Sequence, residues 1–384
     1  MAIIQGTITI LLFIFILGAL VIIHEFGHFV LARLFGMRVH EFGIGFPPRA
    51  KVMRDRGETI YTLNWLPIGG FVRLEGEDGD SDDPRSFAVA RLWKQLVVLV
   101  AGVAMNLVLA FVIFTGIAWL ASPFVGVRFW TVDPGSPAAV AGLQPGDAIV
   151  SVNGQRYEIF GSQTVLDAIR AEAGRTVTLG ILRDGSRIEV PVAIRSSDQI
   201  DATNGALGIS GRTKPFEEAY FGEYTGRPLG DAIALGVDQT GRAFGMILDG
   251  LGKLVSSVVT NPTQAPPVSG PIGIASIVGQ VFWQAGPIMT LYLAALLSAN
   301  LALVNVLPFP PLDGGRMLVL IIKAVMSRGR RGLRRAGVNV GGPTAETAVT
   351  AERMAYLVGF VFLFAFLIWI SVFDIARFGS GGTP

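Results

Sequence analysis

Two histidines and a glutamate near the N-terminus have the types and spacing of a metal site. His24, Glu25 and His28 fall within an apolar stretch that runs from about residue 8 to residue 34. On a helix, residues four apart lie on one face, so both imidazoles can reach one ion, with the carboxylate beside them. Zinc held by nitrogen ligands with an open position activates water, and a nearby carboxylate can take the proton. The motif therefore predicts zinc-dependent hydrolysis of amide bonds.

A purely structural role for these side chains is the alternative, because a lone histidine on an apolar face is more often buried and hydrogen-bonded than metal-bound. The chain has only three histidines, however, and two of them stand in this motif. A charged side chain at the centre of a bilayer helix costs about 2.5 to 3.5 kcal/mol on the insertion scale. Glu25 therefore needs a partner or a wet cavity, which favours the metal site.

A carboxylate near the C-terminus is the candidate for the third metal ligand. Asp313 follows residues 305–312, in which three prolines must interrupt a helix. Irregular backbone at membrane depth is tolerated only where it is buried in protein or lines a wet cavity. The chain has no cysteine, and His40 lies outside the apolar stretch, so Asp313 is the predicted ligand. In the alternative, Asp313 belongs to a turn between half-helices, which would leave its carboxylate in lipid.

Long apolar stretches must position these groups. The chain is 51% hydrophobic, which indicates a membrane protein, and its formal charge of +2 does not suggest binding to nucleic acid. The absence of cysteine excludes disulfides and Cys-ligated zinc. The predicted fold is a mainly α-helical polytopic membrane protein with four transmembrane helices, at residues 7–34, 95–121, 287–326 with an interruption, and 354–374.

Basic residues predict the orientation of these spans. Arginines and lysines are frequent between residues 38 and 91 and again between residues 328 and 335, whereas no lysine or arginine precedes the first span. By the positive-inside rule both loops are cytoplasmic, and both termini and the long middle segment are outside. The N-terminus lacks the basic region of a signal peptide, so the first span is retained. The first and third spans then run in the same direction, which brings His24 and Asp313 to one depth.

Residues 41–74 predict a membrane-associated β-hairpin on the cytoplasmic side. Extended segments at 49–54 and 59–65 flank a turn at 55–57, and residues 67–73 form another extended piece. A protease needs its substrate extended, and adding the substrate as an edge strand would supply that shape. The alternative is a plain cap over the site. Ser81 to Pro84 predict the start of a helix that leads through Trp93 into the second span.

The middle of the chain predicts an inserted α+β domain followed by a surface helix. Residues 132–154 resemble the bacterial PDZ signature, and Arg183 to Gly185 indicate a late hairpin turn. Such domains bind extended peptide segments, although a spacer that binds nothing is the alternative. Residues 228–260 have an apolar stripe at helical spacing and five charges, which favours an amphipathic helix on the membrane surface over a fifth span.

Taken together, the motifs at 24–28, 67–72, 132–154, 270–274 and 305–315 resemble the site-2 protease family of intramembrane zinc metalloproteases, specifically the bacterial regulator of sigma-E protease group. The resemblance covers nearly all of the chain. It departs from the family where Val103 rather than proline follows Gly102, and only one PDZ-like signature is visible. It implies that Glu25 is the general base and that the zinc ligands are His24, His28 and Asp313. It also implies that Asn305 contacts substrate or stabilises the transition state, with Asn106 in a similar role. Gly69 and Gly70 are also predicted to contact substrate.

The expected function is hydrolysis of peptide bonds within or next to transmembrane segments, in the bacterial inner membrane with the active site toward the cytoplasm. The expected partners are single-span membrane protein substrates, a peptide segment at an extracytoplasmic PDZ domain, and the lipid bilayer. A catalytically inactive PDZ-bearing scaffold and a metal transporter are the alternatives. The expected division is a membrane core at 1–123, the PDZ domain at 124–212, an amphipathic helix and re-entry segment at 213–286, and a second membrane core at 287–384.

Overall fold

The computed structural model describes residues 2–55, 57–77, 81, 83–160, 163–200, 205–211, 219–260, 266, 268–335 and 345–379. The chain forms two compact units. The first comprises Met1–Val112, Thr240–Gly279 and Leu293–Ser380, and the second comprises Ile113–Gln239, Gln280–Tyr292 and Gly381–Pro384.

Long apolar helices dominate the structure. Among the described residues, five helical stretches are long and apolar enough to cross a membrane, and three of them agree with the first, second and fourth predicted spans. The amphipathic helix α5 also qualifies, so a count of four spans stays a prediction. The helices are α1 (Ala2–Leu34), α2 (Leu92–Leu120), α5 (Leu229–Thr260), α6 (Pro271–Val306), α7 (Asp313–Arg335) and α8 (Ala345–Gly379).

The third predicted span corresponds to the second part of α6 and the first part of α7. Helix α6 begins at Pro271, and Gly286 within it has the non-helical angles φ 82° and ψ −176°, so two helices meet there at a kink and the second begins at the predicted Pro287. It ends at Val306, and α7 is a separate helix, so the predicted interruption is confirmed. The N-terminal amides of α6 find their acceptor far along the chain, since the buried Asp374 accepts from Gly270 N (3.2 Å) and Gly273 N (2.8 Å). Pro271 at the first helical position is the local signal for this start, whereas the contact with Asp374 has none.

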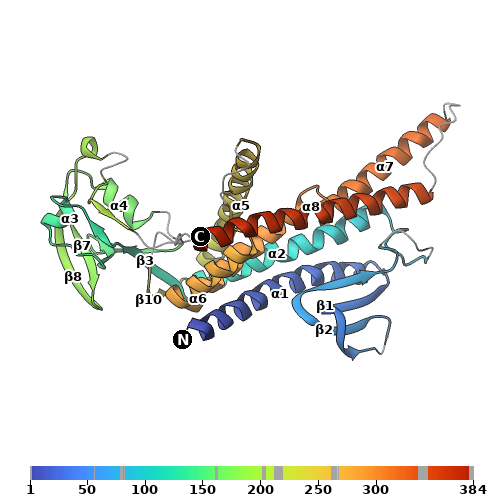
Figure 1. Ribbon diagram of the computed structural model, residues 1–384, viewed down its shortest axis with the longest axis horizontal. Helices are drawn as coiled ribbons and strands as arrows, with labels where there is room; N and C mark the ends of the chain where they lie inside the picture. The colour runs from blue at the N-terminus through green and yellow to red at the C-terminus, as the bar shows by residue number, and fades with distance from the viewer. Residues whose placement is uncertain are drawn as a thin grey trace. The chain divides into compact units, whose positions relative to one another are not determined.

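Strands β1 (Val39–Arg54) and β2 (Ile60–Leu74) form the predicted hairpin, which packs against α1 (Figure 1). The ends nearest the turn pair as expected, Arg54 with Tyr61 and Lys51 with Leu63. The start of β1 pairs with two different parts of β2. Gly43, for example, faces both Thr62 and Phe71. The two strands therefore bend into four extended pieces in the order 49–54, 60–64, 41–44 and 70–74, which places residues 70–74 at one edge.

The helix predicted from Ser81 is wrong for the residues described there. The segment forms turns up to α2, which begins at Leu92. The Asp83 side chain accepts from Arg85 N (2.8 Å) and its carbonyl accepts from Ser86 N (2.8 Å). Aspartate bonds of this kind close a tight turn instead of starting a helix. Phe87 N then donates to Glu75 O (2.8 Å), which ties the segment to the end of β2.

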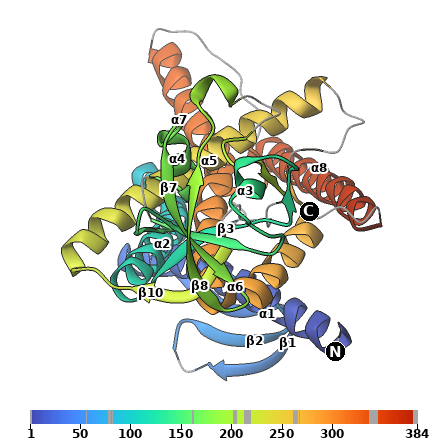
Figure 2. The same cartoon turned by 90° about the vertical axis from the view of Figure 1, so that its left-hand side faces the viewer.

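The second unit contains a six-stranded sheet with the order β10-β3-β6-β5-β7-β8 (Figure 2). The expected late turn is present, with Asp184 and Gly185 at positive φ between β7 and β8. The core of the second unit is formed by buried residues that include Phe129, Ile149 and Leu179. The strands are β3 (Ser122–Arg128), β4 (Thr131–Val132), β5 (Ala148–Val152), β6 (Gln155–Glu158), β7 (Thr176–Arg183), β8 (Ser186–Ala193), β9 (Ile209–Ser210) and β10 (Ala219–Thr225), and the short helices are α3 (Pro137–Val140) and α4 (Val165–Ala171).

Candidate metal centre

Helix α1 brings His24 and His28 together at one buried point. The residues are 5% and 6% exposed, and their Nε2 atoms lie 3.1 Å apart. The neighbouring helix makes room for them through Gly102, where a Cβ atom would lie 2.5 Å from His28 Nε2 and 2.8 Å from His24 Cε1. The small residues of the second span therefore have a specific purpose, since they let α2 pass close to both imidazoles.

Asp313 reaches the same point from the first position of α7. Its Oδ2 lies 2.9 Å from His24 Nε2 and 3.3 Å from His28 Nε2. The two glycines that follow allow this position, because a Cβ atom at Gly314 would lie 2.0 Å from Val306 O and one at Gly315 would lie 2.6 Å from Phe309 O. Any side chain there would push the start of α7, and Asp313 with it, away from the histidines.

The other ring nitrogens show which atoms are free to bind a metal. His28 Nδ1 lies 2.7 Å from Val98 O and must donate its proton to that carbonyl, which leaves Nε2 with a lone pair. His24 Nδ1 lies 3.4 Å from the Asn106 amide, whose buried Oδ1 has no hydrogen-bond partner among the described residues. Turning that amide end for end lets Oδ1 accept from His24 Nδ1.

The donor set fits zinc. Two imidazole Nε2 lone pairs and one carboxylate oxygen within 3.3 Å of one another would repel unless a cation or a proton lay between them. Two histidines and one carboxylate are a common ligand set for catalytic zinc, which keeps a fourth position open. The hydrogen bonds at the Nδ1 atoms complete the arrangement expected around such ligands.

Glu25 lies beside the donor atoms without being fixed by them. Its carboxylate comes within 4.8 Å of the donor atoms of His24 and His28. Glu25 Oε2 accepts from Val72 N at 3.1 Å, so the edge piece of β2 holds the carboxylate toward the site. A carboxylate held next to an ion by one backbone amide has a free oxygen for proton transfer.

A cavity of about 370 Å³ gives access to this cluster. Asn305 and Gly70 line it, and Asn305 Nδ2 lies 3.4 Å from His24 Nε2. Of the other residues predicted to contact substrate, Asn106 and Gly69 are not among the described lining residues. Asn106 is fully buried on the Nδ1 side of His24, and Gly69 has φ +78° and faces Val21.

The cavity also contains residues that sequence reasoning missed. Glu77 and Arg316 line it, and the two side chains form an ion pair. A sequence signal for Arg316 exists, because a residue three positions after Asp313 on one helix lies on the same face and so near the same cavity. Glu77 lies in a loop, where spacing does not indicate which residues are neighbours. His40 lies outside the cluster, as expected, and pairs with Glu75 at 2.5 Å.

Comparisons with known proteins agree with this chemistry. A sequence model described as Peptidase family M50 matches residues 12–341. A Mesorhizobium japonicum protein that is named as a zinc metalloprotease is 31% identical, over 83% of this chain and 90% of that protein. The zinc metalloprotease RasP of Geobacillus kaustophilus is 28% identical, over 96% of this chain and 98% of that protein. The PDZ domain of an SdrC-like protein from Listeria innocua is 23% identical over 22% of this chain and 91% of that domain, with a TM-score of 0.18, which carries no weight for the fold.

Proposed function

Because the chain belongs to peptidase family M50, the site-2 protease family of zinc metalloproteases, we propose that it hydrolyses peptide bonds within or next to the transmembrane segments of single-span membrane proteins. One observation carries this proposal. His24 and His28 stand on a helix long and apolar enough to cross a membrane, and Asp313 and Glu25 meet them at the wall of a cavity. A hydrolytic site in that setting is suited to a substrate that is itself in the membrane.

In this proposal His24, His28 and Asp313 hold the zinc ion. Bound zinc acts as a Lewis acid that makes water a better nucleophile at neutral pH and polarises the scissile carbonyl. Glu25 takes the proton from the attacking water and delivers it to the departing amide nitrogen. Asn305 faces the same space, and its N–H groups donate to the oxygen on which negative charge develops.

The edge of the hairpin presents the substrate. Gly70, Phe71 and Val72 line the cavity and belong to the edge piece of β2. A substrate segment that pairs with this edge would lie extended beside Glu25, with its amides accessible. A photo-reactive group at position 71 should then cross-link to a bound substrate, whereas the same group at position 53, in the far piece of the sheet, should not. Equal cross-linking from both positions would rule out this mode of binding.

The distribution of basic residues supports a bacterial inner-membrane protein with its site toward the cytoplasm, and the signature at 132–154 supports an extracytoplasmic PDZ domain that binds extended peptides. Since the chain has no cysteine, single introduced cysteines report on sidedness without background. Asp184→Cys should react with an impermeant maleimide in intact cells, and Asp55→Cys should react only after lysis. The reverse pattern would invert the proposed topology.

The central test is Glu25→Gln in the full chain, co-expressed with tagged single-span membrane proteins. We expect the variant to retain zinc and to lose cleavage by at least about 100-fold, because general acid–base catalysis contributes about 10² to 10⁴. Glu58→Gln, at an exposed carboxylate that pairs with Arg85, is the matched control and should cleave normally. Cleavage by Glu25→Gln at the normal rate would exclude the general-base role. A wild-type protein that holds no zinc and cleaves nothing would instead favour the scaffold alternative.

A further inference from the structure

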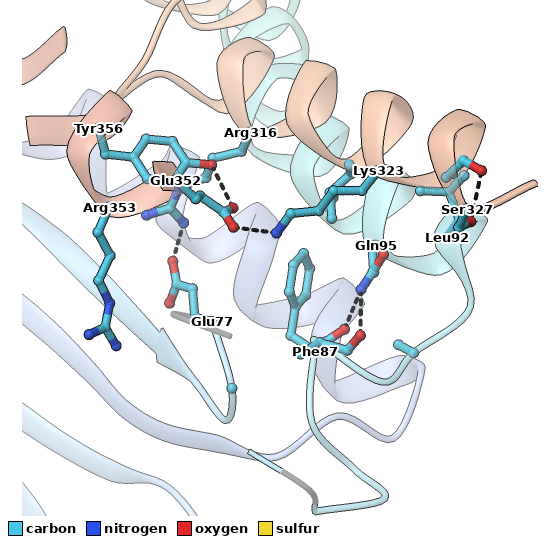
Figure 3. Close-up of a pocket in the computed structure, with 15 residues that line it drawn as sticks. Glu77, Phe87, Leu92, Gln95, Arg316, Lys323, Ser327, Glu352, Arg353 and Tyr356 are labelled. Atoms are coloured by element: carbon cyan, nitrogen blue, oxygen red, sulfur yellow. Dashed lines mark hydrogen bonds and ion pairs between the residues drawn. The ribbon is translucent and has the colours of Figure 1, made fainter. Parts of the chain in front are cut away.

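The cavity of about 370 Å³ beside the histidines is called the metal cavity below. A second cavity, of about 430 Å³, adjoins it, and Figure 3 shows the residues that line this second cavity. Glu77, Phe87 and Arg316 line both cavities, and we call these three residues the partition. The metal-site residues line the first cavity and are not among the described residues that line the second. A molecule that moves from one cavity to the other must therefore pass the partition.

An ion pair closes the partition. Arg316 Nη1 pairs with Glu77 Oε1, and Glu77 Oε2 accepts from Leu74 N at 3.3 Å. Figure 3 shows this pair beside Tyr356, whose ring centre lies 6.0 Å from the Arg316 guanidinium. The side chains are 38% and 23% exposed, so both are accessible from the cavities. The pair is thus able to exchange partners, unlike a fully buried one.

Peptide hydrolysis creates new charges close to this pair. Water adds across the amide, a C–O bond forms and the C–N bond breaks, and at neutral pH the two new ends are a carboxylate and an ammonium group. Ionised groups in apolar surroundings are costly unless they are paired. Among the described residues that line the metal cavity, Arg316 is the only arginine or lysine. Its planar guanidinium suits a carboxylate, which it can bind through two parallel hydrogen bonds.

The second cavity is suited to an apolar peptide. Phe87, Leu92 and Leu320 line it, with alanines 88, 90 and 324. Apart from Glu77, its described charged groups lie on α7 and α8, where Lys323 pairs with Glu352 and Tyr356 Oη donates to Glu352 (3.4 Å). The wall next to the partition is therefore able to accept side chains from a membrane segment, and the charged groups offer contact with water.

We propose that Arg316 takes up the newly formed C-terminal carboxylate of the product by giving up its ion pair with Glu77, and that this exchange opens the partition so that the product leaves through the second cavity. This inference rests on the proteolytic function proposed above. Arg316 lies one helical turn after Asp313, so it is the first cation that a carboxylate meets on leaving the donor cluster.

The test uses an apolar, fluorescently labelled nonapeptide with a free C-terminal carboxylate and the same peptide with a C-terminal amide. Both are titrated into the zinc-loaded full chain carrying Glu25→Gln, so that neither is cleaved. We expect Arg316→Gln to reduce the preference for the carboxylate about tenfold, and Glu77→Gln to increase it, because the guanidinium is then no longer neutralised. Arg316→Lys should give an intermediate value. Arg85→Gln, which removes a cation that lines neither of the two cavities, should change nothing.

If the ion pair had only a structural role, the result would be different. The Arg316→Gln and Glu77→Gln variants would then shift the preference for the carboxylate peptide over the amide peptide in the same direction, or would not shift it at all. Either result would overturn the inference. Zinc content and thermal unfolding are measured for each variant, so that a misfolded protein is recognised. Failure of the proposed function is separate, since it would show as a wild-type chain that cleaves no membrane substrate.

Discussion

At the scale of single residues, the two histidines proposed to hold zinc are oriented by groups that lie behind them. His28 Nδ1 is held by a backbone carbonyl, Val98 O, and His24 Nδ1 faces Asn106. Each contact fixes which ring nitrogen carries the proton and so presents Nε2 to the ion. Asn106 is therefore placed to position His24, and it is fully buried on the side of the imidazole away from the cavity.

Replacing Asn106 by leucine should lower the affinity for zinc about 10- to 100-fold, because His24 loses the acceptor that fixes its ring. Zinc retained during titration with a competing chelator measures the effect. Asn106→Asp keeps an acceptor oxygen at the same place and should hold zinc more firmly than the leucine variant. If Asn106→Leu bound zinc as tightly as the wild type, the role assigned to Asn106 would be wrong.

Sequence reasoning reached the chemical groups but not their surroundings. His24, Glu25, His28 and Asp313 carry a recognisable spacing or setting, and the structure brings all four together. The Val98 carbonyl has no side-chain signature, so it could not be found. Asn106 was noticed for its polarity, yet only the fold shows on which side of the imidazole it lies.

At the scale of elements, close approach of α1 and α2 holds the site together. A Cβ atom at Gly27 would lie 2.4 Å from Ala101 O and 2.8 Å from Met105 Cγ. Small residues at helix interfaces in membranes allow such approach, and packing rather than the hydrophobic effect then stabilises the pair. The glycine in the middle of the histidine motif is thus a packing requirement.

Gly27→Ala should destabilise the protein by about 1–3 kcal/mol, because the methyl group meets backbone atoms that cannot rotate away. Gly6→Ala, on the same helix, is the control, since a Cβ atom there has no described atom within 4 Å. It should be neutral or slightly stabilising. Thermal unfolding of the two variants in detergent gives the comparison, and equal melting temperatures would contradict the packing argument.

Hydropathy located most helices, because a span needs about 20 apolar residues and little else. It placed the start of the third span at Pro287, where the second part of α6 begins after the non-helical Gly286, and it left out the first part, which begins at Pro271. The amides at that first start are bound by Asp374, a contact more than 100 residues away in the chain. The first half of β1 was missed for a similar reason, since it lies between two parts of β2, the near part at 60–63 and the distant end at 70–74.

At the scale of the whole molecule, the second unit carries its own response to pH. Asp147 is 1% exposed, and Arg183 donates to both of its oxygens at 2.8 and 2.7 Å. Burial alone would raise the pKa of Asp147, but the bonds from Arg183 and from Gln144 N outweigh it and lower the pKa below its ordinary value. A lowered pKa in the folded state means that the ionised form stabilises this unit.

The stabilisation of this unit by ionised Asp147 should be fully present above the pKa of the carboxyl in the unfolded state, near 3.9. It should be lost as the pH falls through the lower pKa of the folded state. Arg183→Met should cost about 3 kcal/mol at pH 7, because it leaves the Asp147 carboxylate buried without its partner. The variant should also no longer lose stability on acidification, since burial then favours the protonated acid. The rate at which pepsin cuts within residues 148–193, measured from pH 5 to pH 2, tests both points. An equal acid response in the two proteins would contradict the assignment.

The separation of the metal donors along the chain has a consequence for biosynthesis. His24 and Asp313 are 289 residues apart, and α7 follows α1, α2, α5 and α6 along the chain. A ribosome must therefore add 289 residues after His24 before the proposed zinc site has its carboxylate. A nascent polypeptide that ends before Asp313 carries the histidine pair without the proposed third donor, so we expect it to have no proteolytic activity while the chain is still being inserted.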